Sequence, residues 1–173
     1  MARVSIAELS AQDGEEFVAA MRASRELHRP WTAPPQTRDD FAVLLRRTED
    51  ASFVSLVVRR RQDGALVGYF NISGIIRGPL QSAFLGYSVV AAHAGQGYMS
   101  EALELVLAHA FGPLALHRIE ANIQPANASS IALAARGGFV KEGFSERYLM
   151  IAGEWRDHER WAMRVEQWRA RRR

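Results

Sequence analysis

A glycine-rich loop in the middle of the chain carries the first residues whose types and spacing could do chemistry. Its sequence, GQGYMS at residues 95–100, follows a short run of β-branched and aromatic residues and precedes apolar residues at three- and four-residue spacing. This pattern predicts a strand, a loop and an α-helix that ends at Gly112 and Pro113. Backbone N–H groups can converge at the start of that helix, where they lack internal partners and the helix dipole is positive. Such a helix start can bind phosphate.

Glycine spacing alone leaves two interpretations of this loop, a plain strand-to-helix turn and a phosphate site. Two known phosphate loops do not match it. The ATP-type loop requires a lysine that is absent here, and the dinucleotide-binding loop would need a glycine at Ser100. The identity of the bound group must therefore come from other motifs.

Motifs before and after the loop narrow the choice. The loop, the pair Asn127 and Ser130, and the later Gly138 and Phe139 together resemble the GCN5-related N-acetyltransferase (GNAT) superfamily, whose members hold acetyl-coenzyme A. Further segments resemble the RimJ- and RimL-type ribosomal-protein alanine N-acetyltransferases: residues 71–79, 85–89, 117–119 and 153–158. The resemblance covers essentially the whole chain, and several motifs in the right order are more specific than any one of them.

The resemblance implies an enzyme, an acyltransferase that moves the acetyl group of acetyl-coenzyme A onto a free amine. The implied acceptor is the N-terminal α-amine of a protein, such as a ribosomal protein. Two alternatives stay open. One is acetylation of a small-molecule amine, and the other is a non-catalytic module that binds acyl-coenzyme A or assists ribosome assembly. A monomer and a homodimer are both compatible with the sequence.

The resemblance also implies which residues form the site. In the family, the central strand and the fifth strand separate halfway along, and the pantetheine arm pairs with backbone groups in the gap. The cofactor side is expected to comprise Val89, Val90, Gly95, Gln96, Gly97, Tyr98, Met99, Ser100, Asn127 and Ser130. The acceptor side is expected to comprise His28, Trp31, Tyr87 and Glu120. Structural roles stay open for two of them, since Asn127 could simply cap its helix and Trp31 could anchor a loop.

The expected reaction is direct attack by the amine on the thioester, with no covalent acetyl-enzyme. By the resemblance, Val89 or its neighbour would supply an N–H group to the oxyanion, and Ser130 would protonate the departing thiolate. Many relatives use a tyrosine for this protonation, but its position here is Ala134. No carboxylate lies on the central strand, so no general base is assigned, although Glu120 or a water chain could assist. An α-amine of pKa about 8 is neutral in roughly a tenth of molecules at pH 7, which favours it over a lysine amine.

The elements that must position these residues belong to one α+β domain at residues 1–165. We expect a mixed, mostly antiparallel sheet of six or seven strands, flanked by helices and splayed between its central strands. Strands are predicted near residues 4–6, 53–59, 66–76, 85–90, 118–124, 139–151 and 155–163. Helices are predicted near residues 11–22, after a cap formed by Thr37 and Asp40, at residues 99–110 and after Asn127. Residues 25–35, which contain three prolines, are predicted to form a loop.

Composition limits the possible functions. The chain has 173 residues, 48% of them hydrophobic, which suits one globular domain, and it has no cysteine, which excludes disulfides, thiol nucleophiles and thiolate metal sites. No apolar run has the length of a membrane span and no secretory signal is recognised, so we expect a soluble, cytoplasmic protein without a membrane partner. Histidines and acids do not occur at metal-ligand spacing, so no metal is expected. Asp157 and His158 are adjacent on a predicted strand and face opposite ways, which makes them structural or substrate-wall residues rather than a catalytic pair.

Basic charge is concentrated at the C-terminal end. The formal net charge is +3, and residues 164–173 contribute +4 through five arginines and one glutamate. We therefore treat residues 166–173 as a basic tail. A solvated, frayed end is the favoured interpretation, and contact with ribosomal RNA or an acidic protein is the alternative.

Overall fold

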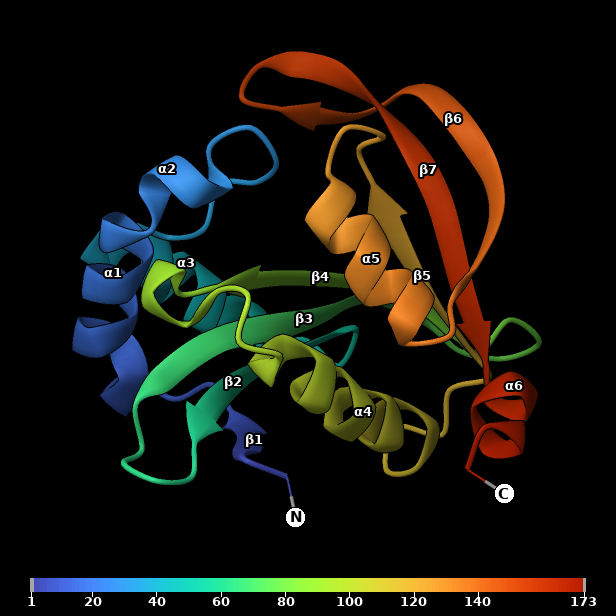
Figure 1. Ribbon diagram of the computed structural model, residues 1–173, viewed down its shortest axis with the longest axis horizontal. Coiled ribbons are helices and arrows are strands. Elements are labelled where there is room, and N and C mark those ends of the chain that lie inside the picture. The colour runs from blue at the N-terminus through green and yellow to red at the C-terminus, as the bar shows by residue number, and fades with distance from the viewer. Residues whose placement is uncertain (1, 173) are drawn as a thin grey trace.

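One mixed sheet of seven strands organises the fold. The computed structural model describes residues 2–172, and its strands lie in the order β1-β2-β3-β4-β5-β7-β6 (Figure 1). The strands are β1 (Val4–Glu8), β2 (Phe53–Arg60), β3 (Leu66–Ile76), β4 (Ser82–Val89), β5 (Arg118–Ile123), β6 (Val140–Ile151) and β7 (Glu154–Arg164). The helices are α1 (Gly14–Ala23), α2 (Arg25–His28), α3 (Arg38–Arg47), α4 (Tyr98–Phe111), α5 (Ala128–Arg136) and α6 (Val165–Ala170), with short 3₁₀ turns η1 (Ala11–Asp13) and η2 (Ala91–His93). The predicted α+β class is confirmed, and each predicted strand and helix is present.

The sheet is antiparallel except between β4 and β5, which run parallel and pair only briefly. Their register extends from the pair Ser82 and Arg118 to the pair Phe84 and Glu120. Because β4 continues beyond this point while β5 diverges, the predicted splay of the central strands is confirmed. We call the gap between the two strands the split.

The backbone of Val89 faces the split. Val90, directly after β4, donates its N–H to Val67 O on β3 at 2.8 Å. Successive residues of an extended strand direct their N–H and C=O groups to opposite sides. The N–H and C=O of Val89 therefore point away from β3, toward the side that β5 has left.

Two hydrophobic layers cover the two faces of the sheet. Helices α4 and α5 bury Leu103, Leu107 and Leu133 against one face, and Figure 1 shows both helices in front of the sheet. Helices α1 and α3 bury Phe17 and Phe41 against the other face. None of the helices in residues 2–172 is both long and apolar enough to cross a bilayer. The split thus opens between two packed layers, each of which can supply residues to it.

The predicted start of α3 is confirmed by its cap. Asp40 donates its backbone N–H to Thr37 Oγ1 at 3.1 Å, and Thr37 donates its backbone N–H to Asp40 Oδ2 at 3.2 Å. The two residues therefore satisfy two N–H groups that the helix itself leaves unpaired. Aspartate replaces the more usual glutamate or glutamine without loss of this geometry.

Residues 25–35 differ from the predicted loop, because Arg25–His28 form the short helix α2. The prolines that indicate a loop begin only at Pro30. The four residues of α2 contain no glycine or proline, and Ser24 C=O accepts the N–H groups of Leu27 and His28, so a helical turn forms there. This turn buries His28, which is 4% exposed.

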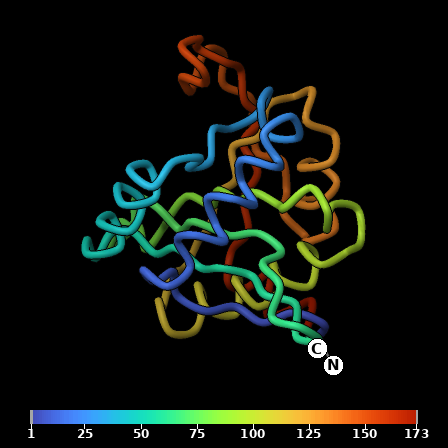
Figure 2. Tube along the Cα trace, turned by 90° about the vertical axis from the view of Figure 1, so that its left-hand side faces the viewer, coloured from blue at the N-terminus to red at the C-terminus, as the bar shows by residue number. Residues whose placement is uncertain are grey.

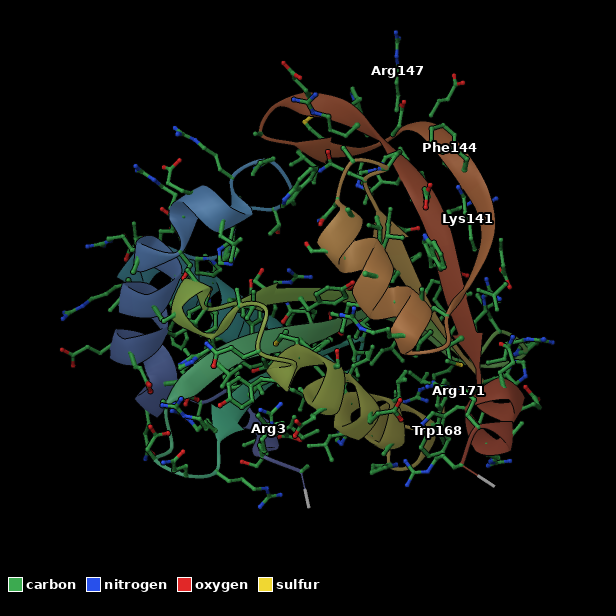
Figure 3. The ribbon with its side chains drawn as sticks, in the orientation of Figure 1. Arg3, Lys141, Phe144, Arg147, Trp168 and Arg171 are labelled. Atoms are coloured by element: carbon green, nitrogen blue, oxygen red, sulfur yellow. The ribbon has the colours of Figure 1, made fainter. Side chains whose placement is uncertain are left out.

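The C-terminal segment is held by packing. Trp168 of α6 packs on Phe111 of α4 with ring centroids 5.6 Å apart. Arg171 donates to the backbone carbonyl groups of Arg136 and Gly137 at the end of α5, and Figure 3 labels Trp168 and Arg171 beside α6. The favoured interpretation of a frayed end is therefore wrong for the described part of this segment, because the tryptophan anchors it. Contact with ribosomal RNA or an acidic protein stays an untested alternative.

Strands β6 and β7 form a long, curved hairpin whose tip stands away from the body of the molecule (Figures 1 and 2). The register shifts between Ser145 and Leu149. In this irregular stretch Arg147 has a φ of 47°, and its N–H donates to Asp157 Oδ1 at 2.8 Å. Such a shift bends a strand and re-aims its side chains.

Candidate functional site

A cavity of about 870 Å³ lies at the split between β4 and β5. Its lining comes from both strands, from the loop before α4, from α5, from α2 and the residues after it, and from the β6–β7 hairpin. The fold thus brings together segments that are far apart in the sequence. Most of the residues predicted for the cofactor side line this cavity: Val89, Gly95, Gly97, Tyr98, Met99, Ser100, Asn127 and Ser130.

The loop before α4 has the geometry of a backbone anion site. Gly95 and Gly97 have φ values of 73° and 82°, in the left-handed region that favours glycine. Gly97 is the N-cap of α4, so the unpaired N–H groups of the first helical turn lie at the loop. A Cβ at Gly95 would meet none of the described atoms within 4 Å, so the space beside the loop is open. These features allow the loop to bind phosphate through its backbone.

Val90 and the Gln96 side chain lie outside the cavity lining, and their contacts explain why. Val90 donates its N–H to β3, and its carbonyl accepts the N–H of His93 at 2.9 Å. Both backbone groups of Val90 are therefore used within the protein, which corrects the prediction that they pair with the cofactor. The Gln96 side chain donates to Ala92 O at 2.8 Å and is turned back toward η2, so Gln96 can contribute only its backbone.

Ser130 and Tyr87 form a hydroxyl pair beside the split. Tyr87 Oη lies 2.6 Å from Ser130 Oγ, and either oxygen can be the donor. The Tyr87 ring packs against Phe70, and burial raises the pKa of Tyr87, so its hydroxyl keeps its proton at neutral pH. Tyr87 is predicted on the acceptor side, but the structure places it with Ser130 on the face covered by α4 and α5.

Asn127 caps α5, as the structural interpretation of this residue predicts. Its Oδ1 accepts the backbone N–H of Ser130 at 3.2 Å. The residue also lines the cavity. Capping and a place beside a ligand are therefore compatible, because the cap fixes the start of α5 at the edge of the split.

His28 closes the cavity next to Val89. Its Nε2 lies 2.7 Å from Val89 O, and because a carbonyl oxygen only accepts, Nε2 carries the proton. Nδ1 is then the nitrogen with the lone pair, and it is buried without a hydrogen-bond partner among the described residues. Burial lowers the pKa of His28, which favours the neutral ring. The structure thus brings His28 to the cavity, and its role toward an amine stays a prediction.

Trp31 lines the cavity near His28 and is half-buried. The side chain of Gln124, just after β5, donates from Nε2 to Pro30 O at 3.2 Å and to Trp31 O at 3.3 Å. Gln124 therefore ties the segment after α2 to the end of β5. Both Gln124 and Asn122 line the cavity. The sequence places them on the polar side of a strand, and this alternation is the signal from which they could have been found.

Glu120 does not line the cavity, contrary to the prediction. It is paired in register with Phe84, at a position where β4 and β5 are still joined. Its carboxylate accepts a hydrogen bond from Arg118 Nε at 2.7 Å, and Arg118 also pairs with Glu142. Glu120 therefore belongs to an ion-pair cluster outside the split.

The cavity is nearly free of charged side chains. Among the described residues that line it, none is Asp or Glu, and Arg136 alone is Lys or Arg. Across residues 2–172, no group of three or more His, Cys, Asp or Glu side chains is arranged to hold a metal ion. Polar contacts in the cavity must therefore come from backbone, hydroxyl, amide and imidazole groups.

The β6–β7 hairpin supplies a further wall of the cavity, and among the residues of this wall the sequence singled out only His158. Tyr148, Leu149, Ile151 and His158 line the cavity. His158 is 2% exposed, whereas the adjacent Asp157 is exposed and accepts the N–H of Arg147. The two residues face opposite ways, as predicted, and the substrate-wall interpretation fits His158. The bent register of the hairpin brings this wall to the split, and no local pattern encodes that bend.

Comparison with known proteins identifies the family. Residues 3–140 match the family model described as an acetyltransferase (GNAT) domain. The chain belongs to the GNAT acetyltransferase family. The resemblance to the GNAT superfamily is thereby confirmed. The model ends where β6 begins, so the hairpin lies beyond the matched residues.

Similar proteins narrow the relationship. Over 97 residues, the chain is 45% identical to the probable N-acetyltransferase YjcK of Bacillus subtilis (strain 168), with 56% of this chain and 54% of that protein covered. Over 103 residues, it is 40% identical to the ribosomal protein uS5-alanine N-acetyltransferase of Escherichia coli (strain K12), with 60% and 53% covered. The chain spans about half the length of these relatives. The fold matches Mycobacterium smegmatis RimJ in complex with CoA-disulfide with a TM-score of 0.86 and 29% identity, with 95% of this chain and 83% of that chain covered.

Proposed function

We propose that the chain is an N-acetyltransferase that uses acetyl-coenzyme A to acetylate the N-terminal α-amine of a protein. The observation that carries the proposal is the cavity at the split, which joins the glycine loop to the wall at His28 and Trp31. One end offers backbone donors for a diphosphate, and the other offers an uncharged wall for an amine and the peptide behind it. Family membership and the similarity to alanine N-acetyltransferases support this reaction.

The parts of acetyl-coenzyme A fit the cavity in a defined order. The diphosphate fits the loop at Gly95 and Gly97, where N–H groups of α4 lack internal partners. The pantetheine arm fits the split, because after Phe84 the edge of β4 that faces away from β3 has no strand paired with it, and an extended chain can pair with the backbone there. Asn127 and Ser130 would lie along this arm, at the start of α5.

Catalysis would rest on placement and on a backbone donor. The N–H of Val89 faces the split and would stabilise the oxyanion that forms when the amine attacks the thioester carbon. His28 donates to the carbonyl of the same residue at 2.7 Å, which fixes the orientation of Val89. Alignment of amine and thioester would add part of the roughly 7–11 kcal/mol that proximity can supply. This route needs no covalent acetyl-enzyme.

Ser130 would protonate the thiolate that leaves. Its Oγ lies 2.6 Å from Tyr87 Oη, and burial raises the pKa of Tyr87, so Tyr87 can act as the donor in this pair. Ser130 then accepts from Tyr87, and its own hydroxyl hydrogen is free to point toward the sulfur. Tyr87 would therefore position Ser130 rather than touch the substrate.

The cavity lining favours a peptide N-terminus over a polycationic amine. Burying several ammonium charges without carboxylate partners is unfavourable, and among the described lining residues none is acidic. A peptide carries a single α-amine, which titrates near pH 8, followed by a neutral backbone. The amide side chains of Asn122 and Gln124 can hydrogen-bond such a backbone.

Release of free thiol from acetyl-coenzyme A tests the proposal. Parallel reactions contain a peptide with a free N-terminus, the same peptide with a blocked N-terminus and a free lysine, a panel of small amines including polyamines, or no acceptor. We expect release with the free N-terminus and little with the others. Release of thiol with small amines alone would show that the acceptor is a small amine rather than a protein N-terminus. Binding of coenzyme A without release in any reaction would favour a non-catalytic module.

A further inference from the structure

The reaction proposed above needs a group that takes a proton from the attacking amine, and the hairpin wall offers one. We propose that Nε2 of His158 is the general base of this reaction. The inference rests on the proposed function. His158 lies on β7, beyond the residues that the family model matches.

The tautomer of His158 is set by its own strand. Nδ1 lies 2.9 Å from Arg156 O. Because a carbonyl oxygen only accepts, Nδ1 of the neutral ring carries the proton and Nε2 keeps the lone pair. Nε2 is the ring nitrogen farther from the backbone, so it is directed away from β7 toward the cavity that His158 lines. The ring of Tyr148 packs edge-on against the imidazole, with ring centroids 6.2 Å apart, and gives the imidazole orientation a second restraint.

His158 stands on the acceptor side of the split. It shares a face of β7 with Arg160, which is paired in register with Asn122 on β5. His158 and Asn122 therefore face the same way, on the side of the sheet opposite to the one covered by α4 and α5. His28 belongs to the other wall of this cavity, and Figure 1 shows α2 and the hairpin on opposite sides of the space above β4. An amine that enters between these walls passes His158.

The other candidates for the base are already engaged or misplaced. His28 uses its Nε2 proton on Val89 O, and its other ring nitrogen, Nδ1, is fully buried, so neither nitrogen is open to an entering amine. His93 lies beside the glycine loop, at the cofactor end of the cavity. Glu120 is held by Arg118 outside the cavity. Among the described lining residues, His158 is the one that combines an acceptor-side position with a lone pair set toward the cavity.

Two arginines, Arg156 and Arg160, share the face of β7 on which the imidazole lies, and the other groups that face it are uncharged. From β5 it faces the neutral Asn122, and from β6 it faces Ser145, its register partner, and Tyr148. Across the cavity stands His28, which burial keeps neutral. On β7 itself, Asp157 is turned to the opposite face. No described carboxylate thus pairs with the ring.

The protons balance over one turnover. As the amine nitrogen bonds to the carbonyl carbon, His158 Nε2 takes one proton from that nitrogen, directly or through one water. When the C–S bond breaks, the sulfur keeps the electron pair and takes one proton from Ser130. His158 then gives its proton to water, and Ser130 regains one from water, so that amine and thioester yield amide and thiol.

Replacing His158 by asparagine keeps its hydrogen bond and removes the base. The asparagine N–H₂ group can donate to Arg156 O, whereas no atom replaces Nε2. We expect kcat with a free N-terminal peptide to fall about 100-fold at pH 7, with unchanged affinity for coenzyme A by calorimetry. The deficit should shrink as the pH rises, because hydroxide from solvent can then take the proton that Nε2 no longer accepts. His117→Asn, which changes an exposed histidine paired with Glu166, is the control and should match the wild type.

Two results would overturn the assignment. One is a His158→Asn protein with the kcat and pH profile of the wild type. The other applies if this variant does not fold: His158→Ala is then assayed with added imidazole, and a variant that binds coenzyme A but gains no rate from imidazole excludes the base. Failure of the proposed function is distinct, because then the wild type itself releases no thiol with any peptide.

Discussion

Replacing Gly97 by alanine tests whether the loop before α4 binds the diphosphate of coenzyme A. Gly97 has a φ of 82°, and a left-handed conformation costs a residue with a Cβ about 1–2 kcal/mol. The added Cβ would lie 3.2 Å from Arg3 Nη2, at the end of a flexible side chain that can move aside. The free energy of unfolding should therefore fall by about 1–2 kcal/mol, and Tm by about 2–8 °C.

The effect on coenzyme A binding should exceed what this loss of stability can cause in a protein that remains folded. If the loop relieves the strain by shifting, its N–H groups lose their alignment with the diphosphate. A hydrogen bond to a charged group contributes about 1.5–3 kcal/mol. Loss of one such bond would weaken binding about 10- to 150-fold.

Calorimetric titration with coenzyme A measures this loss, and Gly64→Ala is the matched control. Gly64 lies in the turn between β2 and β3, has a φ of 75°, and would place a Cβ within 4 Å of none of the described atoms. The control should lose a similar amount of stability and keep its affinity. Unchanged affinity in Gly97→Ala would refute the assignment of the loop. An equal loss of affinity in both variants would trace the effect to general destabilisation.

Three other perturbations test separate contacts. Tyr87→Phe removes the hydroxyl 2.6 Å from Ser130 Oγ and should lower kcat about fivefold, the value of one ordinary hydrogen bond. Ser130→Ala should lower kcat about 100-fold in the thiol-release assay. The double variant should have the same kcat as Ser130→Ala, because Tyr87 acts only through Ser130. Additive losses would contradict a shared role. Trp168→Ala should lower Tm by about 4–8 °C in calorimetry through the loss of about 2 kcal/mol of packing, with unchanged coenzyme A affinity; an unchanged Tm would contradict the docking of α6. Burial lowers the pKa of His28 in the folded state below the ordinary value of 6.5, so the unfolded chain binds the proton more readily. The contribution of His28 to the free energy of unfolding should therefore be complete above about pH 6.5 and should decline as the pH falls below it. Urea unfolding between pH 5 and 7 should show a shallower decline for His28→Gln, and equal slopes would exclude this contribution.

Local patterns predicted the elements well because they depend on residues close in sequence. The cap of α3 needs only Thr37 and Asp40, which are three residues apart. The alternation along β5 predicted its buried side, where Ile119 and Ile123 are almost fully buried. The glycines of the loop predicted the start of α4 because a left-handed turn and a helix N-terminus are both local features.

Contacts between distant segments account for most of what the sequence could not show. Tyr87 and Ser130 are 43 residues apart, and His28 and Val89 are 61 residues apart, so neither pair leaves a periodic signal. The α6 anchor is similar, since a tryptophan becomes an anchor only when another helix is found to lie beside it. These contacts require the packed layers on both sides of the sheet.

The wrong prediction for Glu120 shows that a correctly predicted strand does not by itself identify which of its residues line the site. Glu120 and Asn122 both belong to the polar side of β5. The register with β4 decides which of them lies past the split, and Glu120 is still opposite Phe84. That register depends on residues distant in the sequence. An alternating pattern can therefore predict which residues share a face of β5, but not which of them lie past the point where β4 and β5 separate.

Gly68 explains how the loop and Val89, the proposed oxyanion donor, are held at a fixed separation. It lies on β3 opposite Val89, and a Cβ there would overlap Ser88 O and lie 3.1 Å from Met99 Sδ. Its φ is outside the left-handed region, so close approach alone requires glycine here. The first turn of α4 thus packs directly on β3, beside the end of β4. A thioester bound by its diphosphate at the loop would then reach the N–H of Val89 at one position along the split, which is the condition for catalysis by placement.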